Sequence, residues 1–223
     1  MKRYMSLILV ILFMISNKAG ASIEGYEIAS KSKEDNITLF AKNENGFYHD
    51  FKIDFKGSIY SRPFWVNVTN PTYAPEIIYK DINKDEKNEL IIILTKGYGT
   101  GLLWEEVHVF DTKNQAVNEV LVDNPIAIIN KNVKTKISNE KAVLTISGKT
   151  TFVDIASLEI NPSNLFEDIG FGSIIDYEVR DDQLIAKVIG QVSQAGFIGE
   201  IVITYDYRDK MYQAKSIEFQ PYK

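Results

Sequence analysis

The sequence predicts a mainly β fold built from antiparallel hairpins and meanders, arranged as a sandwich or as propeller-like blades, with little helix. Three observations indicate this. From residue 34 onward, short runs rich in Val, Ile, Thr, Tyr and Phe alternate with polar residues, as half-buried strands do. Turn-forming residues separate these runs at intervals of about 8–15 residues. No long stretch has the 3.6-residue periodicity of an amphipathic helix.

The first 21 residues have the features of a secretory signal peptide. Lys2 and Arg3 precede an apolar run from Met5 to Ile15, and small residues follow at Ala19–Ala21. The apolar run is shorter than the roughly 20 residues that a transmembrane helix needs. No cysteine lies near the cleavage position, which excludes a lipoprotein anchor. We therefore expect cleavage after Ala21 and a secreted, extracellular protein with no membrane span in its mature form.

The composition limits the chemistry. The chain has no cysteine, which excludes thiol catalysis and zinc–thiolate sites, and its length is sufficient for a sizeable core without disulfides. The net charge is −5, and it becomes more negative when Lys2, Arg3 and Lys18 leave with the signal peptide. We expect no nucleic acid partner for such an anion, whereas divalent cations are suitable ligands.

The first hairpin is predicted around Asn45-Gly46, since both residues tolerate the positive φ of a two-residue turn. A second is predicted around Asp111–Asn114. Further turns are predicted at Asn139-Glu140, Gly148-Lys149, Asp181-Asp182 and Asp209-Lys210.

One segment interrupts the β pattern. The stretch Ile155–Gly170 holds the one plausible helical turn of the chain, but its Pro162 also suits a linker. We place a boundary there, between an N-terminal β region over residues 22–160 and a C-terminal four-stranded meander over residues 172–223. The two regions form either separate units or one continuous domain.

An acidic loop precedes the most apolar strand. Residues 81–90 read "DINKDEKNEL", and the run "LIIIL" begins at the last of them. Residues with oxygen-bearing side chains occupy alternate positions of the loop. A tight loop can thereby present several oxygens to a hard cation such as calcium. An EF-hand is excluded, because Ile92 stands where the bidentate acid should be and a strand follows instead of a helix. A solvated turn of mixed charge is the alternative to a metal site.

This loop resembles the calcium loop of FG-GAP/VCBS-type repeats, in which the pattern D-x-[DN]-x-D-G-x-x-[DE] leads directly into an apolar strand of a propeller blade. The resemblance covers residues 75–111, in a single copy. More broadly, the chain resembles uncharacterised secreted proteins of Gram-positive bacteria that carry one such repeat. It implies calcium as a cofactor. The implied ligands are Asp81, Asn83, Asp85, the Lys87 carbonyl and Glu89. Glu86 replaces the glycine of the repeat, which costs roughly 1 kcal/mol if the residue needs positive φ.

Aromatic residues next to this loop provide a second hypothesis. The segment from Lys96 to Trp104 is rich in glycine and is predicted to connect a hairpin, because it lacks the ending of a phosphate-binding loop. Tyr98 and Trp104 could contact a sugar or peptide. Trp65 is expected to pack in the core or at an edge, and joining such a surface is the alternative.

The remaining polar residues give weaker signals. His49 and His108 lie in alternating runs with no second histidine at metal spacing, so we expect surface or cross-strand positions. The acidic pairs Glu105-Glu106 and Asp181-Asp182 contain neighbours that point to opposite faces of a strand, so neither pair alone provides two facing carboxylates.

Together these features predict a secreted, non-enzymatic β protein with a calcium-stabilised FG-GAP-like loop, acting as a binding or structural module. Its partner would be an extracellular or envelope ligand that the sequence does not identify. Two alternatives stay open. One is an extracellular module that binds carbohydrate or the cell envelope, and the other is a hydrolase with unidentified carboxylates.

Overall fold

The computed structural model describes residues 22–113 and 116–222. The predicted signal peptide, residues 1–21, lies outside the described residues. The protein is 63% strand and 9% helix, which confirms the mainly β prediction. No helix in the described ranges is long and apolar enough to cross a membrane.

The first sheet is a four-stranded antiparallel meander. Its strands in order are β1 (Glu27–Ser32), β2 (Ile37–Glu44), β3 (Phe47–Phe55) and β4 (Ser58–Val68). Asn45 and Gly46 join β2 to β3 with φ values of 54° and 82°, which confirms the first predicted hairpin turn. The 3-10 turn Pro71–Tyr73 then leads into the second sheet.

The second sheet contains eight strands and closes partly on itself. They are β5 (Glu76–Lys80), β6 (Glu89–Gly99), β7 (Leu102–Asp111), β8 (Asn118–Val122), β12 (Gly170–Arg180), β13 (Gln183–Gln191), β14 (Phe197–Arg208) and β15 (Met211–Pro221). Their order is β12-β13-β14-β15-β8-β7-β6-β5, and β12 also pairs in parallel with β7. A ring of strands therefore runs from β7 through β8 and β15 back to β12. The C-terminal meander β12–β15 and the strands β5–β8, which lie on either side of the expected boundary, share this one sheet.

The third sheet is small, and its buried residues Ala142, Leu144 and Ile146 belong to the same core as the interior of the ring. Its order is β11-β10-β9, formed by β9 (Val133–Ile137), β10 (Lys141–Ile146) and β11 (Lys149–Asp154). The helix α1 (Pro125–Asn132) precedes it and is capped by the Asn124 side chain, which accepts N–H bonds from Ile126 and Ala127. The segment expected to hold a helical turn contains two 3-10 turns, Ala156–Leu158 and Pro162–Asn164.

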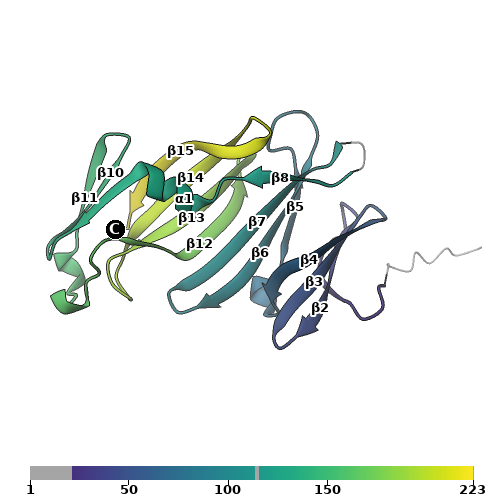
Figure 1. Cartoon of the computed structure of the whole chain (residues 1–223), viewed down its shortest axis with the longest axis horizontal. Coiled ribbons are helices and arrows are strands. Elements are labelled where there is room, and N and C mark those ends of the chain that lie inside the picture. The colour runs from purple at the N-terminus through teal and green to yellow at the C-terminus, as the bar shows by residue number, and fades with distance from the viewer. Residues whose placement is uncertain (1–21, 114–115, 223) are drawn as a thin grey trace, which may run out of the picture.

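Two hydrophobic cores meet at β6. Leu90, Ile92 and Leu94 face the first sheet, whereas Ile91 and Ile93 face the interior of the ring. The strand is thus buried on both faces, which explains why its sequence is continuously apolar instead of alternating. Figure 1 shows the resulting shape, with β10 and β11 at one end of the long axis, β2–β4 at the other and the large sheet between them.

Candidate functional site

The acidic loop connects β5 to β6, and its side chains turn back onto its own backbone. One carboxylate oxygen of Asp81 accepts the N–H of Lys84 at 2.7 Å, and the other accepts the N–H of Glu86 at 2.9 Å. Asn83 Oδ1 accepts the N–H of Asp85 at 2.9 Å. These local bonds wrap the loop around its polar side chains.

Two residues of the loop have positive φ. Lys84 has φ 64° and Glu86 has φ 67°, in the left-handed region that favours glycine. Glu86 is the position at which the resembled repeat has glycine. The backbone therefore adopts the conformation expected of a glycine there, even though this chain has a residue with a side chain.

Glu89 connects the two ends of the acidic loop through hydrogen bonds. It is 2% exposed at the start of β6. One of its carboxylate oxygens accepts the N–H groups of Ile82 and Asn83 at 3.0 and 3.2 Å, and the other accepts the Asn83 side-chain amide at 2.7 Å. Burial raises its pKa, although the two backbone N–H groups oppose that rise. Glu89 thus serves the loop itself before it could serve a metal.

A cation from another loop lies against the acidic loop. The Lys113 ammonium lies 2.5 Å from Asp85 Oδ2 and 3.4 Å from Asp111 Oδ2. The hydrogen bond from Lys113 is the largest of the effects that lower the pKa of Asp85. Thr112 also donates its hydroxyl to the Asn88 carbonyl at 2.7 Å, so the β7–β8 connection is tied to the acidic loop.

The implied calcium ligands fit a cation site in part. Asp81, Asn83, Asp85 and Glu89 lie in one hydrogen-bonded network, and Lys87 joins it by donating its N–H to Asp85 Oδ1 at 3.1 Å. Within the described ranges, no three His, Asp or Glu side chains are grouped closely enough to hold a metal ion. Asp81, Asn83 and Asp85 would supply the side-chain oxygens, with Lys113 displaced from Asp85.

The aromatic pair of the second hypothesis is divided between two faces. Trp104 pairs with Gly97 and Tyr98 pairs with Leu103, and successive cross-strand pairs point to opposite faces. Tyr98 stacks on Tyr73, with ring centroids 4.4 Å apart. Trp104 is 50% exposed and lies under the Lys96 ammonium at 5.0 Å. The two rings therefore do not form one platform.

His108 belongs to a charged cluster that the sequence did not reveal. Its Nδ1 lies 2.8 Å from Glu119, its Nε2 lies 3.8 Å from Glu106, and its ring stacks on buried Trp65 at 4.2 Å. Burial lowers the pKa of His108, but the two carboxylates outweigh burial and raise it overall. This arrangement fits the expected cross-strand position, and it places Trp65 inside the core, away from any ligand.

Glu105 points the other way from Glu106. It accepts the Tyr177 N–H at 2.7 Å, where β12 separates from β7, and burial raises its pKa to about 7. Asp176 and Glu76 add repulsion to this effect. None of these three acids lines the cavity between α1 and β15, the cavity between β15 and the hairpin of β10 and β11, or the cavity around residues 158–166 and 193–195. The perturbed acid Glu105 thus lies outside these cavities.

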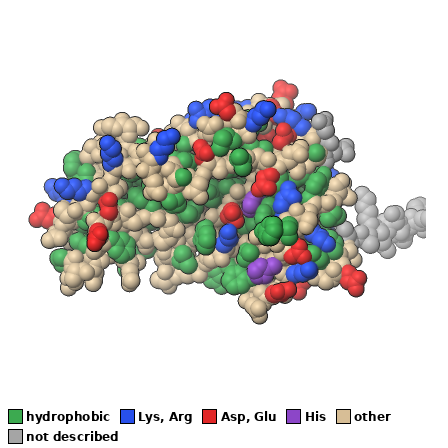
Figure 2. Space-filling view, in the orientation of Figure 1, with side chains coloured by type: hydrophobic (Ala, Val, Ile, Leu, Met, Phe, Trp, Pro, Cys, Tyr) green, Lys and Arg blue, Asp and Glu red, His purple; other side chains and the backbone are tan. Residues whose placement is uncertain are grey.

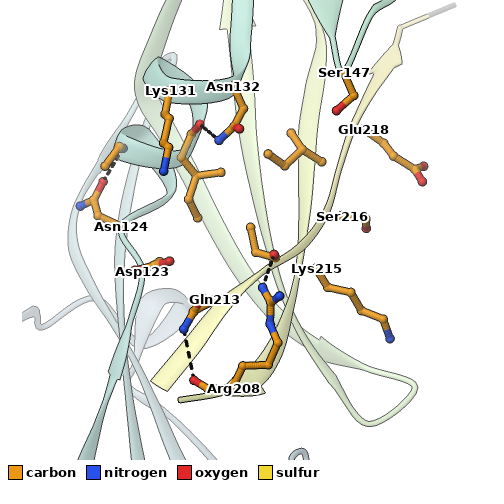
Figure 3. Close-up of a pocket in the computed structure, with 14 residues that line it drawn as sticks. Asp123, Asn124, Lys131, Asn132, Ser147, Arg208, Gln213, Lys215, Ser216 and Glu218 are labelled. Atoms are coloured by element: carbon orange, nitrogen blue, oxygen red, sulfur yellow. Dashed lines mark hydrogen bonds between the residues drawn. The ribbon is translucent and has the colours of Figure 1, made fainter. Parts of the chain in front are cut away.

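A cavity between α1 and β15 was not predicted from the sequence. Its volume is about 580 Å³, and Figure 3 shows Lys131 reaching into it from α1 while Arg208 extends upward from β14. Arg208 donates to the Ala214 carbonyl at 2.9 Å. The lining comes from segments around residues 123–132, 147 and 208–218, which no local motif connects.

No family model, curated protein or solved structure matches the chain. The FG-GAP resemblance is therefore a prediction that depends on the loop residues alone.

Proposed function

We propose that the protein is a secreted, non-catalytic binding or structural module in which the acidic loop is a cation clamp that calcium can occupy. The observation that carries the proposal is the Lys113 ammonium at 2.5 Å from Asp85 and 3.4 Å from Asp111. A positive group of the protein already neutralises Asp85, one of the implied ligands. A free cation of sufficient charge would compete for the same place.

The position of the loop gives such a cation a structural effect. The loop ends at Glu89, the first residue of β6, and β6 is buried between the two cores. A cation bound by Asp81 and Asp85 would hold the loop closed and favour the register in which β5 pairs with β6. A ligand of the folded state stabilises that state by mass action.

Calcium suits the donors better than a transition metal does. All the implied ligands are oxygens, and extracellular calcium sites operate with dissociation constants of about 10⁻⁴–10⁻³ M. Lys113 and Glu86 both place this loop at the weak end of that range, because the first competes for Asp85 and the second adds strain.

The test is thermal unfolding of residues 22–223 with calcium and with chelator, in wild type and in Lys113→Gln. For a dissociation constant near 10⁻³ M, 10 mM calcium raises the melting temperature by about 3 °C. Lys113→Gln removes the competing ammonium and is expected to show a larger rise. Magnesium at equal concentration controls for ionic strength.

Two results would overturn the calcium proposal. One is an unchanged melting temperature in both wild type and Lys113→Gln. The other is an equal rise in a variant that carries Asp81→Ala and Asp85→Ala, because calcium would then act elsewhere on the protein.

A carbohydrate- or envelope-binding surface is a second candidate, supported by the half-exposed ring of Trp104. Trp65 is buried, so a ligand-dependent change in tryptophan fluorescence would come from Trp104. Titration with cell-wall fragments should shift this emission, and Trp104→Ala should abolish the shift. A flat titration in the presence of calcium would remove this candidate.

A further inference from the structure

The strand β15 has one edge that is paired along its whole length and one that is mostly open. It pairs with β14 from Met211 to Pro221, but with β8 only through Met211 and Tyr212. Beyond Tyr212, no other strand in the described part of the chain pairs with the second edge. The open edge therefore presents backbone groups that another strand could bond.

The register identifies those groups. The Tyr222 N–H donates to the Ile198 carbonyl, which continues the β14–β15 pairing by one residue. In an antiparallel pair every second residue faces the partner strand. Ile217 and Phe219 alternate with the residues that bond β14, so their N–H and C=O groups point to the open edge.

A groove runs along this edge. The cavity of about 580 Å³ lies between β15 and α1, and a second cavity of about 340 Å³ lies between β15 and the hairpin of β10 and β11. Both are lined by Ser147, Ile217 and Glu218, so the two cavities adjoin. Figure 3 shows the helix that carries Lys131 and the strand that carries Lys215 and Ser216 on opposite sides of the first of them.

The usable edge is short. The register of β15 shifts at Lys215, which has no partner between Ala214 and Ser216, and Pro221 lacks an N–H. A bulge and a proline are features that prevent long strands from pairing edge to edge. Between them lies Ser216–Gln220, about 17 Å of extended chain. This length favours a short peptide over a strand from a second copy.

The charge of the groove favours an acidic peptide. Its basic lining residues are Lys131, Lys149, Arg208 and Lys215, and its acidic ones are Asp123 and Glu218. The groove is thus net positive on a chain whose net charge is −5. Figure 2 shows acidic and basic side chains interspersed over the visible face of the molecule.

We propose that this groove binds a short, extended, acidic peptide, which adds a strand to the open edge of β15 at Ser216–Gln220. The backbone of the peptide would bond Ile217 and Phe219, and its carboxylates would face Lys131 and the other basic groups. The site is separate from the acidic loop, so this inference goes beyond the proposed function and does not depend on calcium.

Fluorescence anisotropy tests the proposal with a labelled, end-blocked peptide, Gly-Glu-Val-Glu-Val-Glu-Gly. We expect saturable binding to residues 22–223, and no saturation with the peptide in which lysine replaces every glutamate. The backbone contribution is tested with two versions of the acidic peptide, N-methylated on alternate residues in the two possible phases. Only the phase that removes the N–H groups facing β15 should lose binding.

A pair of variants tests the position. Lys131→Glu is expected to weaken binding of the acidic peptide about fivefold, since it replaces an attraction with a repulsion. Lys136→Glu is the matched control, because Lys136 is exposed on β9 and lines neither of the two cavities. It should bind like wild type, and melting curves should show both variants folded.

Any of four binding results would overturn the proposal. They are equal binding of the lysine peptide, equal loss of binding in both N-methylation phases, equal weakening by Lys131→Glu and Lys136→Glu, and no binding at all. Sedimentation of the free protein checks for a dimer, and a dimer dispersed by Lys131→Glu would assign the edge to a second copy instead. Lys113→Gln should leave peptide binding unchanged, which separates this outcome from that of the calcium experiment.

Discussion

Glu105 and Glu106 are neighbours on β7, and their carboxyls have pKa values shifted in opposite directions. Burial raises the pKa of Glu105 to about 7. The hydrogen bond from His108, together with Lys96, lowers the pKa of Glu106 to about 2. The alternation of a strand accounts for the difference, because one side chain faces the interior of the ring and the other faces solvent and basic partners.

The raised pKa of Glu105 makes folding depend on pH. Between about pH 4.5 and 7 the folded state holds a proton that the unfolded state has lost, so the free energy of unfolding falls as pH rises through this window. Glu105→Gln keeps an acceptor for the Tyr177 N–H and cannot ionise. We expect this variant to be more stable than wild type at pH 8, by an amount on the order of 1–3 kcal/mol.

Urea unfolding at pH 5 and pH 8 measures this effect. The gain should be much smaller at pH 5, where most Glu105 carboxyls are protonated in the folded wild type. His108, whose raised pKa also removes stability as pH rises, is present in both proteins and cancels in the difference. Glu106→Gln is the contrasting control and should be less stable at pH 8. A gain for Glu105→Gln that did not change with pH would contradict the assignment.

The strain at Glu86 gives a second prediction at this scale. Its φ of 67° favours glycine, so Glu86→Gly should raise the free energy of unfolding by up to about 1 kcal/mol. Lys87→Gly is the control, because Lys87 is not among the residues with positive φ, and it should be neutral or destabilising. Equal effects of the two glycines on the urea midpoint would show that position 86 is unstrained.

Some features of single residues could be predicted from the sequence, and others could not. The loop pattern, which is local, pointed to Glu86 as the residue that would be strained if its φ were positive, and its φ is 67°. The burial of Glu89 was not predicted, because it depends on packing β6 between two sheets. The salt bridge from Lys113 to Asp85 was not predicted either, because it joins two separate loops and the sequence of neither loop indicates it.

Hairpins are the elements that the sequence predicted best. Asp181-Asp182 and Asp209-Lys210 both have positive φ at the two turn positions, as Asn45 and Gly46 do, since a two-residue turn is chosen by its own residues. The helix α1 was missed. It has eight residues and begins at Pro125, so too few turns exist for a helical period to emerge.

Asn67 links two elements, and this yields a prediction about them. It is fully buried on β4. Its amide donates to the Val68 and Tyr73 carbonyls at 2.7 and 2.8 Å, and its oxygen accepts the Thr95 N–H of β6 at 2.6 Å. Asn67→Ala should destabilise the protein by about 2–4 kcal/mol, because it leaves buried backbone groups without partners.

Asn43→Ala is the matched control for Asn67→Ala. Asn43 lies on β2 and makes an exposed bond to Glu27 at 3.3 Å, so its loss should change stability by less than about 0.5 kcal/mol. Chemical unfolding followed by circular dichroism compares the two variants. Similar small losses would show that Asn67 does not connect the sheets energetically.

The architecture of the whole molecule depends on long-range contacts that no local sequence pattern predicts. The parallel pairing of Ile174 with Leu103 joins strands from the two regions expected on either side of residues 155–170. The prediction located the strands of both regions, but the boundary was placed by proline and glycine content, which reports only local chain geometry. The shared sheet is fixed by long-range pairing instead.

This architecture predicts unfolding as a single unit. The strand β6 contributes to both cores, so neither core survives its loss. Tryptophan fluorescence, which reports on Trp65 in one core, and near-ultraviolet circular dichroism from tyrosines such as Tyr205 and Tyr212 in the other should give one coincident urea transition. Two separated midpoints would indicate that the cores unfold independently.

The pairing of β7 with β12 also affects the rate of folding. Residues 103 and 174 must meet before the ring exists, and the strands that complete it are the last four of the chain. During synthesis, β7 and β8 therefore have edges that lack their partner strands until β12–β15 have been made. Such distant pairing slows folding, to a scale of milliseconds to seconds for β-rich domains. In that interval Ile91 and Ile93 of β6 lack the β12–β15 residues that bury them, and exposed apolar surface of this kind favours aggregation.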